Sequence, residues 1–346
     1  MAYTELLTAH GLTEEQWDRQ IAEEYLGENW WRHLTSSGEN AVIQAKEDLT
    51  KKSGDAITIG LVSEIIGGIV TGRNKGKGNE GYQEYYDQRF VIDNVRVLVK
   101  FEDVPMTQKR VGFDVLQRGK DGLVRKARVR LEEEITNALS DTATGRVRGR
   151  YLYGASDANW NATHATALTA IDNTADQLTS AMISIAKRKA TIPTNAVAKI
   201  RPMMVKNGKN SEEWYILAAH DLAIRDLTDN DATFKNSKLT LTPGSDSPLL
   251  TGSRFKGSWN GVLIYEYDRI LLAASTIQVA HNLFLGAQAG VVVWGQHSKF
   301  GEQTEDVGHD VIYETHEIRT VGKTVFNRTT PEDHGVVHLF SAAVSD

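Results

Sequence analysis

A glycine-rich and polar stretch early in the chain places the strongest constraint on its fold. Residues 67–81 include almost no apolar side chain after Val70, so this stretch cannot bury enough surface to fix its own conformation. Apolar residues alternate on either side of it, over 56–62 and over 90–99, with one slip at 93–94. The alternation predicts two strands in a long hairpin, and an exposed hairpin of this kind normally needs a neighbouring surface to stabilise it.

A helical pattern follows the hairpin. Apolar residues recur mostly at every fourth position over 106–141, which predicts one long helix. Gly119 and Gly122 fall inside this helix, where each costs about 1 kcal/mol relative to alanine. The two glycines therefore indicate close packing or a bend at that point.

The rest of the chain mixes helix and strand patterns. A second helix is expected over 175–189, and a short one over 221–227 that His220 precedes as a capping or packing residue. The predicted fold class is α+β, with an extended arm and an extended hairpin that need partners. Further strands are expected at 199–205, 213–220, 261–267, 289–295 and 310–327.

The first fifty residues are expected to form a separate N-terminal arm (residues 1–50). A capping pattern and apolar residues at every fourth position predict an amphipathic helix over 13–26 with an acidic opposite face. Residues 1–55 carry eleven acidic and five basic side chains, and their net charge of −6 equals that of the whole chain. Trp30 and Trp31 lack a local core, so we expect them to dock on another part of the protein or on another subunit.

Composition excludes several classes of protein and site. The chain has no cysteine, which rules out disulfides and thiolate metal sites. We expect no secretory signal and no membrane partner, because no apolar run approaches the ~20 residues that cross a bilayer. Beyond residue 55 the charges sum to zero, so any contact with nucleic acid must be local.

Four runs of sequence, in order along the chain, resemble a podophage-type family of tailed-phage major capsid proteins. The resemblance spans roughly residues 50–327, and it implies the Johnson fold of those proteins. The runs are Ser53-Gly-Asp-Ala-Ile-Thr-Ile59, Arg130-Leu-Glu-Glu-Glu-Ile135, Trp214-Tyr-Ile-Leu217, and Phe300-Gly-Glu-Gln-Thr-Glu-Asp-Val-Gly-His-Asp310 continuing to Ile318-Arg-Thr-Val-Gly-Lys323.

The resemblance also implies a function and a division of the chain. It implies a virion protein that assembles with itself into hexamers and pentamers of an icosahedral shell, made in the bacterial host cytoplasm. The shell protein would make weak, non-specific contact with the packaged double-stranded DNA. Its further partners would be scaffolding, portal, and decoration or minor capsid proteins. No cofactor and no enzymatic activity are expected. The implied parts are the arm (1–50), an extended hairpin loop with its base strands (51–105), a peripheral domain (106–192) with spine helix 106–141, an axial domain (193–310) and return strands to the peripheral domain (311–346).

Cations and tryptophans are the expected assembly contacts. The hairpin, over 56–103, is expected to lie across an adjacent subunit, and basic residues at its tip would meet acidic groups there. The run 72–77 resembles a phosphate-binding loop, but it has three residues between its glycines and no Ser or Thr after its last lysine. The expected contacts are Arg73, Lys75, Lys77, Trp30, Trp31, Arg125, Arg128 and Arg130.

Two charged clusters leave alternatives open. Residues 106–131 have a net charge of +6. They either face packaged DNA or pair with the acidic arm, and we favour the pairing with the arm. Residues 302–317 are rich in Asp, Glu and His. Strand alternation would place Glu314 and His316 on one face with Asp310 nearby, as metal ligands or, more simply, as ion pairs. The alternative functions are an encapsulin-like compartment and a metal-dependent hydrolase that uses the 302–317 cluster.

Overall fold

A computed structural model describes most of the chain beyond residue 28, and the helix expected over 13–26 lies outside the described residues. The chain divides into two compact units. Unit 1 comprises residues 1–55, 91–139 and 290–322, and unit 2 comprises residues 56–90, 140–289 and 323–346. The described residues are 29–51, 53–62, 65, 67–110, 115–142, 150–154, 168–192, 198–207, 210–240, 254–270, 272–274, 277–326 and 331–344.

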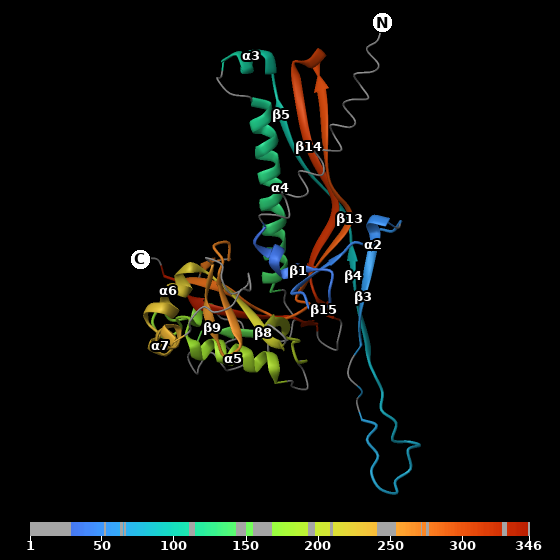
Figure 1. The fold of residues 1–346 in the computed structure, drawn as a ribbon, viewed down its shortest axis with the longest axis vertical. Helices are drawn as coiled ribbons and strands as arrows, with labels where there is room; N and C mark the ends of the chain where they lie inside the picture. Colours follow the sequence, from blue (N-terminus) through green and yellow to red (C-terminus); the bar gives the residue numbers. More distant parts are fainter. Residues whose placement is uncertain are drawn as a thin grey trace. The chain divides into compact units, whose positions relative to one another are not determined.

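Unit 1 is a five-stranded sheet with a long helix against one face (Figure 1). The strand order is β1-β2-β13-β14-β5, with β14 antiparallel to β5 and β13 parallel to β2. The elements are η1 (Trp30–Leu34), β1 (Thr35–Ser36), β2 (Ile43–Lys46), α2 (Asp48–Lys51), β5 (Asp93–Phe101), α3 (Val104–Arg110), α4 (Val115–Ser140), β13 (Gly290–Glu305), η6 (Asp306–Gly308) and β14 (Asp310–Lys323).

The expected long helix is present as two described helices, α3 and α4. Leu123 and Val124 of α4 pack on Tyr313 and its neighbours in the sheet. A Cβ atom at Gly119 would lie 2.2 Å from a ring carbon of Phe101, whereas one at Gly122 would meet nothing within 4 Å. Close packing is therefore confirmed at Gly119, and Gly122 faces open space.

Unit 2 is built on an eight-stranded sheet with the order β6-β17-β12-β8-β10-β9, to which β11 adds beside β12 and β7 beside β8. The α+β fold class is thereby confirmed. The sheet elements are β6 (Tyr151–Tyr153), β7 (Met203–Asn207), β8 (Asn210–Ala219), β9 (Phe255–Trp259), β10 (Val262–Glu266), β11 (Leu272–Ala274), β12 (Gln278–Leu285) and β17 (Val336–Ala342). The other elements are β3 (Ala56–Val62), β4 (Tyr85–Val91), η5 (Leu168–Ala170), α5 (Ser180–Thr191), α6 (Asp221–Asp229), α7 (Ala232–Thr240), β15 (Val325–Phe326) and β16 (Glu332–Asp333).

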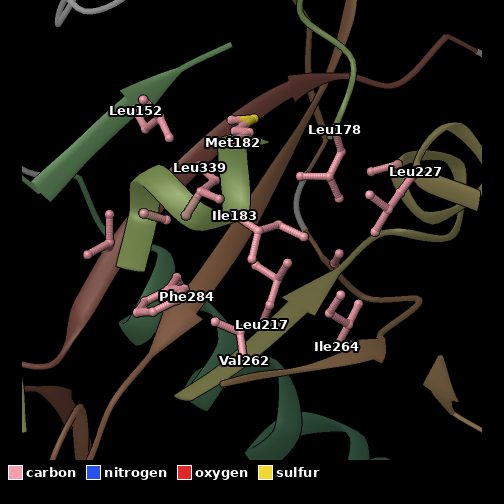
Figure 2. Packing of buried hydrophobic residues seen from close by; sticks show 14 of the residues in the cluster. Leu152, Leu178, Met182, Ile183, Leu217, Leu227, Val262, Ile264, Phe284 and Leu339 are labelled. Carbon is pink, nitrogen blue, oxygen red and sulfur yellow. The ribbon is translucent and has the colours of Figure 1, made fainter. Parts of the chain in front are cut away.

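The core of unit 2 lies between α5 and one face of the sheet (Figure 2). Met182 and Ile183 project from α5 toward Phe284 and Leu339 on the neighbouring strands β12 and β17, and all four are fully buried. The short helix α6 begins as predicted, because Nδ1 of His220 accepts a hydrogen bond from the backbone N–H of Leu222 at 3.2 Å. His220 is therefore a helix cap.

The strand expected over 90–99 is two strands in the structure. Strand β4 ends at Val91 and pairs with β3, whereas β5 begins at Asp93 and pairs with β14. The slip in alternation at 93–94 marks the place where the chain passes from one sheet to another. The hairpin is consequently made of β3 and β4 with the connection between them, and it is shorter than the expected 56–103.

Candidate assembly interface

The β3–β4 hairpin presents apolar and basic side chains to solvent. Ile69 is 89% exposed and Tyr85 is 74% exposed, far more than large apolar side chains of a soluble subunit usually are. Arg73, Lys75 and Lys77 are exposed in the connection between the strands, as the sequence predicted. Val62, Ile65 and Tyr82 are also more than half exposed.

Local hydrogen bonds shape the tip of the hairpin. The backbone N–H of Asn79 donates to the carbonyl oxygen of Gly76 at 3.1 Å, and the Asn79 amide group donates to the carbonyl oxygen of Lys75 at 3.0 Å. The carboxylate of Glu80 accepts from the backbone N–H of Gly78 at 2.7 Å. These bonds form a compact turn, which is built differently from a phosphate-binding loop.

The base of the hairpin is tied down by one glutamine of β4. The amide group of Gln88 donates to the carbonyl oxygen of Lys323 at 2.9 Å, and its oxygen accepts from the backbone N–H of Val325 at 2.7 Å. Phe90, two residues later, is buried. The hairpin is thus anchored at its base and exposed toward its tip.

The expected cations of the long helix differ in their surroundings. Arg125 is exposed, and Arg128 and Arg130 are half-buried. Nε of Arg130 lies 2.9 Å from a carboxylate oxygen of Glu134, one turn along α4. Arg130 is therefore engaged within its own helix, and Arg125 remains available to a partner.

The two tryptophans dock on their own unit. Trp31 is fully buried, and its indole N–H donates to Oγ1 of Thr136 on α4 at 3.2 Å. Asn29 caps the turn that follows it by accepting a hydrogen bond from the backbone N–H of Trp31 at 2.8 Å. Trp30 meets Trp31 edge to face and is half-buried, so it is the tryptophan that keeps an accessible surface.

The 302–317 cluster is organised as ion pairs across strands β5 and β14. The guanidinium of Arg96 binds both carboxylate oxygens of Glu314, at 2.5 and 2.6 Å. These hydrogen bonds hold the pKa of Glu314 below its usual range. Lys100 lies 3.0 Å from Asp310 and lowers the pKa of that carboxyl through their hydrogen bond. The described residues include no group of three or more His, Asp or Glu side chains arranged to hold a metal ion, and Glu314 and Asp310 each pair with a cation.

A buried polar cluster in unit 2 was not predicted from the sequence. Asp333 lies 2.9 Å from Nζ of Lys323 and 3.1 Å from Nε2 of His338, and all three side chains are almost fully buried. Nδ1 of His338 in turn lies 2.8 Å from Nε2 of His281. The four residues come from β12, β14, β16 and β17, so no local spacing in the sequence could reveal that they meet.

Comparison with known proteins gives one family and a set of related folds. A family model described as phage capsid protein matches residues 6–345. The capsid of Ralstonia phage GP4 superposes with a TM-score of 0.75 at 22% identity, with 92% of each chain covered. The cyanophage Pam1 capsid gives 0.74 at 22% identity over 91% of this chain and 92% of that one. The capsid of Helicobacter pylori bacteriophage KHP30 gives 0.66 at 14% identity over 89% of each. No curated protein sequence matches the chain, and none of its described helices is long and apolar enough to span a membrane.

Proposed function

The chain belongs to the phage capsid protein family, and from that premise we propose how this major capsid protein builds its shell. It is a component of the virion capsid, it has the fold of tailed-phage capsid proteins, and it assembles with copies of itself. We infer that the copies form the hexamers and pentamers of an icosahedral head that encloses double-stranded DNA.

The exposed β3–β4 hairpin is the observation that carries this proposal. A two-stranded hairpin is marginally stable alone in water, and this one exposes Ile69 and Tyr85 together with its three basic residues. A neighbouring subunit would cover the apolar side chains and supply acidic partners for Arg73, Lys75 and Lys77. Rings of identical subunits close through contacts of this head-to-tail kind, and many modest contacts made together give a stable shell.

Our division of the chain follows the sheets. Strand β13 pairs with β2 and β14 in unit 1, whereas helix α5 packs on the sheet of unit 2. We therefore propose that the axial domain ends near Gly290 and includes α5, and that α4 is the spine helix of the peripheral domain. The hairpin loop keeps its expected role as a contact between subunits, whereas residues 29–50 of the expected arm pack within unit 1.

The proposed shell function implies further partners. A shell of this kind needs scaffolding, portal, and decoration or minor capsid proteins, and it would be assembled in the bacterial host cytoplasm. DNA would be held by weak, non-specific contact with exposed cations, because the chain as a whole is acidic. Family membership favours the phage shell over an encapsulin-like compartment, and the paired carboxylates of 302–317 give no support to a hydrolase.

Expression of the chain alone tests the proposal. Size-exclusion chromatography and negative-stain electron microscopy should reveal shells, tubes or hexameric rings, and their geometry and nucleic-acid content separate a phage head from a protein compartment. If the chain is a monomer, co-expression with a candidate scaffolding protein should produce shells. A stable monomer under both conditions and at high concentration would contradict the proposal.

A further inference from the structure

The outer face of α3 and of the first half of α4 is basic. Helix α4 turns Leu123, Val124 and Ala127 inward, whereas Arg125 and Lys126 face solvent. Neither Arg125 nor Lys126 takes part in an ion pair within the part of the chain that the structure describes. We call this surface the basic face: its exposed cations are Lys109, Arg110, Arg118, Arg125 and Lys126, and the one exposed carboxylate described among them is Asp121.

The opposite charge is concentrated in the first 28 residues of the same chain. Residues 1–28 contain seven acidic side chains and one basic one, Arg19, a net charge of −6. The charges of residues 29–55 sum to zero, so the excess negative charge of the arm lies entirely in residues 1–28. Residues 1–28 and the basic face therefore carry complementary charges.

The end of the described chain lies beside α4. Asn29 is buried and caps the turn that places Trp31, and the indole of Trp31 is hydrogen-bonded to Thr136 of α4. From Thr136 to Arg125 the helix rises about 16 Å, and to Arg118 about 27 Å. A segment of 28 residues can span at least that distance even at the helical rise of about 1.5 Å per residue.

We propose that residues 1–28 dock on the basic face of α3 and α4 of the same chain and cover it. The tether at Asn29 keeps the acidic segment at high effective concentration beside the helix, so several weak ion pairs suffice to hold it. The docked segment competes with nucleic acid for the same cations. It thereby keeps the subunit from binding nucleic acid through the basic face.

Charge neutralisation in the full-length chain tests the competition. The arm variant carries Glu14→Gln, Glu15→Gln, Glu23→Gln and Glu24→Gln. The control removes four exposed carboxylates elsewhere, with Asp87→Asn, Glu213→Gln, Asp229→Asn and Asp268→Asn. At about 50 mM salt, the arm variant should bind a short DNA duplex about tenfold more tightly than wild type, measured by fluorescence anisotropy. The control should change by about twofold or less. Equal gains in both variants would show an effect of net charge alone and would overturn the proposal.

Cross-linking tests the contact itself, because the chain has no cysteine of its own. Glu23 lies six residues from Asn29, which is about 9 Å along a helix or about 20 Å along an extended chain, and this range brackets the rise of about 16 Å from Thr136, on which Trp31 is anchored, to Arg125. Full-length E23C/R125C protein, treated with a short bis-maleimide, should give an intrachain cross-link of monomer size, identified by mass spectrometry. In the control E23C/L98C, the second cysteine lies on the sheet face opposite α4, and no cross-link is expected. Equal cross-linking of both variants, cross-linked dimers, or no product from E23C/R125C would overturn docking on the same chain.

Discussion

At the scale of single residues, the buried His281 links the stability of unit 2 to pH. Burial lowers the pKa of His281 well below its usual value, and the neighbouring His338 and Lys323 lower it further. Burial alone would raise the pKa of Asp333, but the hydrogen bonds and charges of His338 and Lys323 outweigh burial and hold that pKa well below its usual range. Asp333 is therefore ionised and lies 3.1 Å from Nε2 of His338, whose Nδ1 lies 2.8 Å from Nε2 of neutral His281.

Acid should destabilise unit 2 through His281. A histidine whose pKa is depressed by folding contributes stability that is present above its unfolded pKa of about 6.5 and is lost as the pH falls toward its folded pKa. Between pH 7 and pH 5 the free energy of unfolding should fall by up to about 2 kcal/mol on this account. Urea unfolding of dispersed subunits at both pH values measures the loss. The variant H281Q keeps a side chain that can hydrogen-bond to His338 without titrating, so it should show a smaller loss; the exposed-site control H297Q should match wild type.

The two glycines of α4 should respond in opposite directions to the same substitution. G119A places a methyl group against the Phe101 ring at a distance that real contacts do not reach, and the forced shift should cost about 1–3 kcal/mol of stability. G122A adds a methyl group in open space and should stabilise the helix by up to about 1 kcal/mol. Thermal unfolding of the two variants measures both changes in stability, and a gain in stability from G119A would refute the packing argument.

At the scale of elements, one buried arginine joins α4 to the sheet of unit 1. The side chain of Arg319 on β14 is 1% exposed and lies 2.6 Å from Glu317, and it also binds Glu134 of α4. Its guanidinium stands 5.9 Å from the ring of Trp294. Helix α4 is thereby held to β14 by charge as well as by apolar packing.

Removal of this arginine should cost far more than removal of a surface arginine. R319M takes the nearest cation away from the buried carboxylate of Glu317, and such changes cost about 3–5 kcal/mol. R96M removes the exposed partner of Glu314 and should cost far less, because water screens an exposed ion pair. The difference is measured by urea unfolding of both variants. Similar losses for the two would mean that burial does not set the strength of these pairs.

The sequence predicts elements best where the pattern is local. Spacing along the chain revealed the long helix, the cap at His220 and the exposed basic tip of the hairpin, because each depends on neighbouring residues. The exchange of partner sheets at 93–94 left only a slip in alternation, which does not say which strand pairs with which. The contact of Trp31 with Thr136 joins residues 105 positions apart, and the Asp333 cluster joins four strands. Contacts of that kind depend on topology and become visible only in three dimensions.

At the scale of the whole molecule, the function depends on contacts that a single subunit cannot satisfy. The subunit exposes an apolar and basic hairpin that is anchored at its base by Gln88 and Phe90 and exposed toward its tip. Each contact of the hairpin with a neighbour would be weak, since exposed ion pairs are worth about 0.2–1 kcal/mol. Every subunit in a closed shell would make a contact of this kind, however, so a small change per contact should alter the concentration at which shells form.

Neutralisation of the hairpin tip should therefore raise the assembly threshold without unfolding the subunit. R73Q/K75Q/K77Q removes three proposed ion pairs of about 0.5 kcal/mol each, which corresponds to about a tenfold higher concentration of free subunit in equilibrium with shells. R188Q/K199Q/K235Q removes the same charges from exposed positions of unit 2 and serves as the matched control. Sedimentation of assembly reactions over a series of protein concentrations gives the threshold, and urea unfolding verifies that both variants keep wild-type stability. The threshold of the hairpin variant should also depend less on salt than that of wild type, because screened ion pairs are the interactions it lacks. Equal thresholds for the hairpin variant and the control would show that the tip cations make no contact that the shell needs.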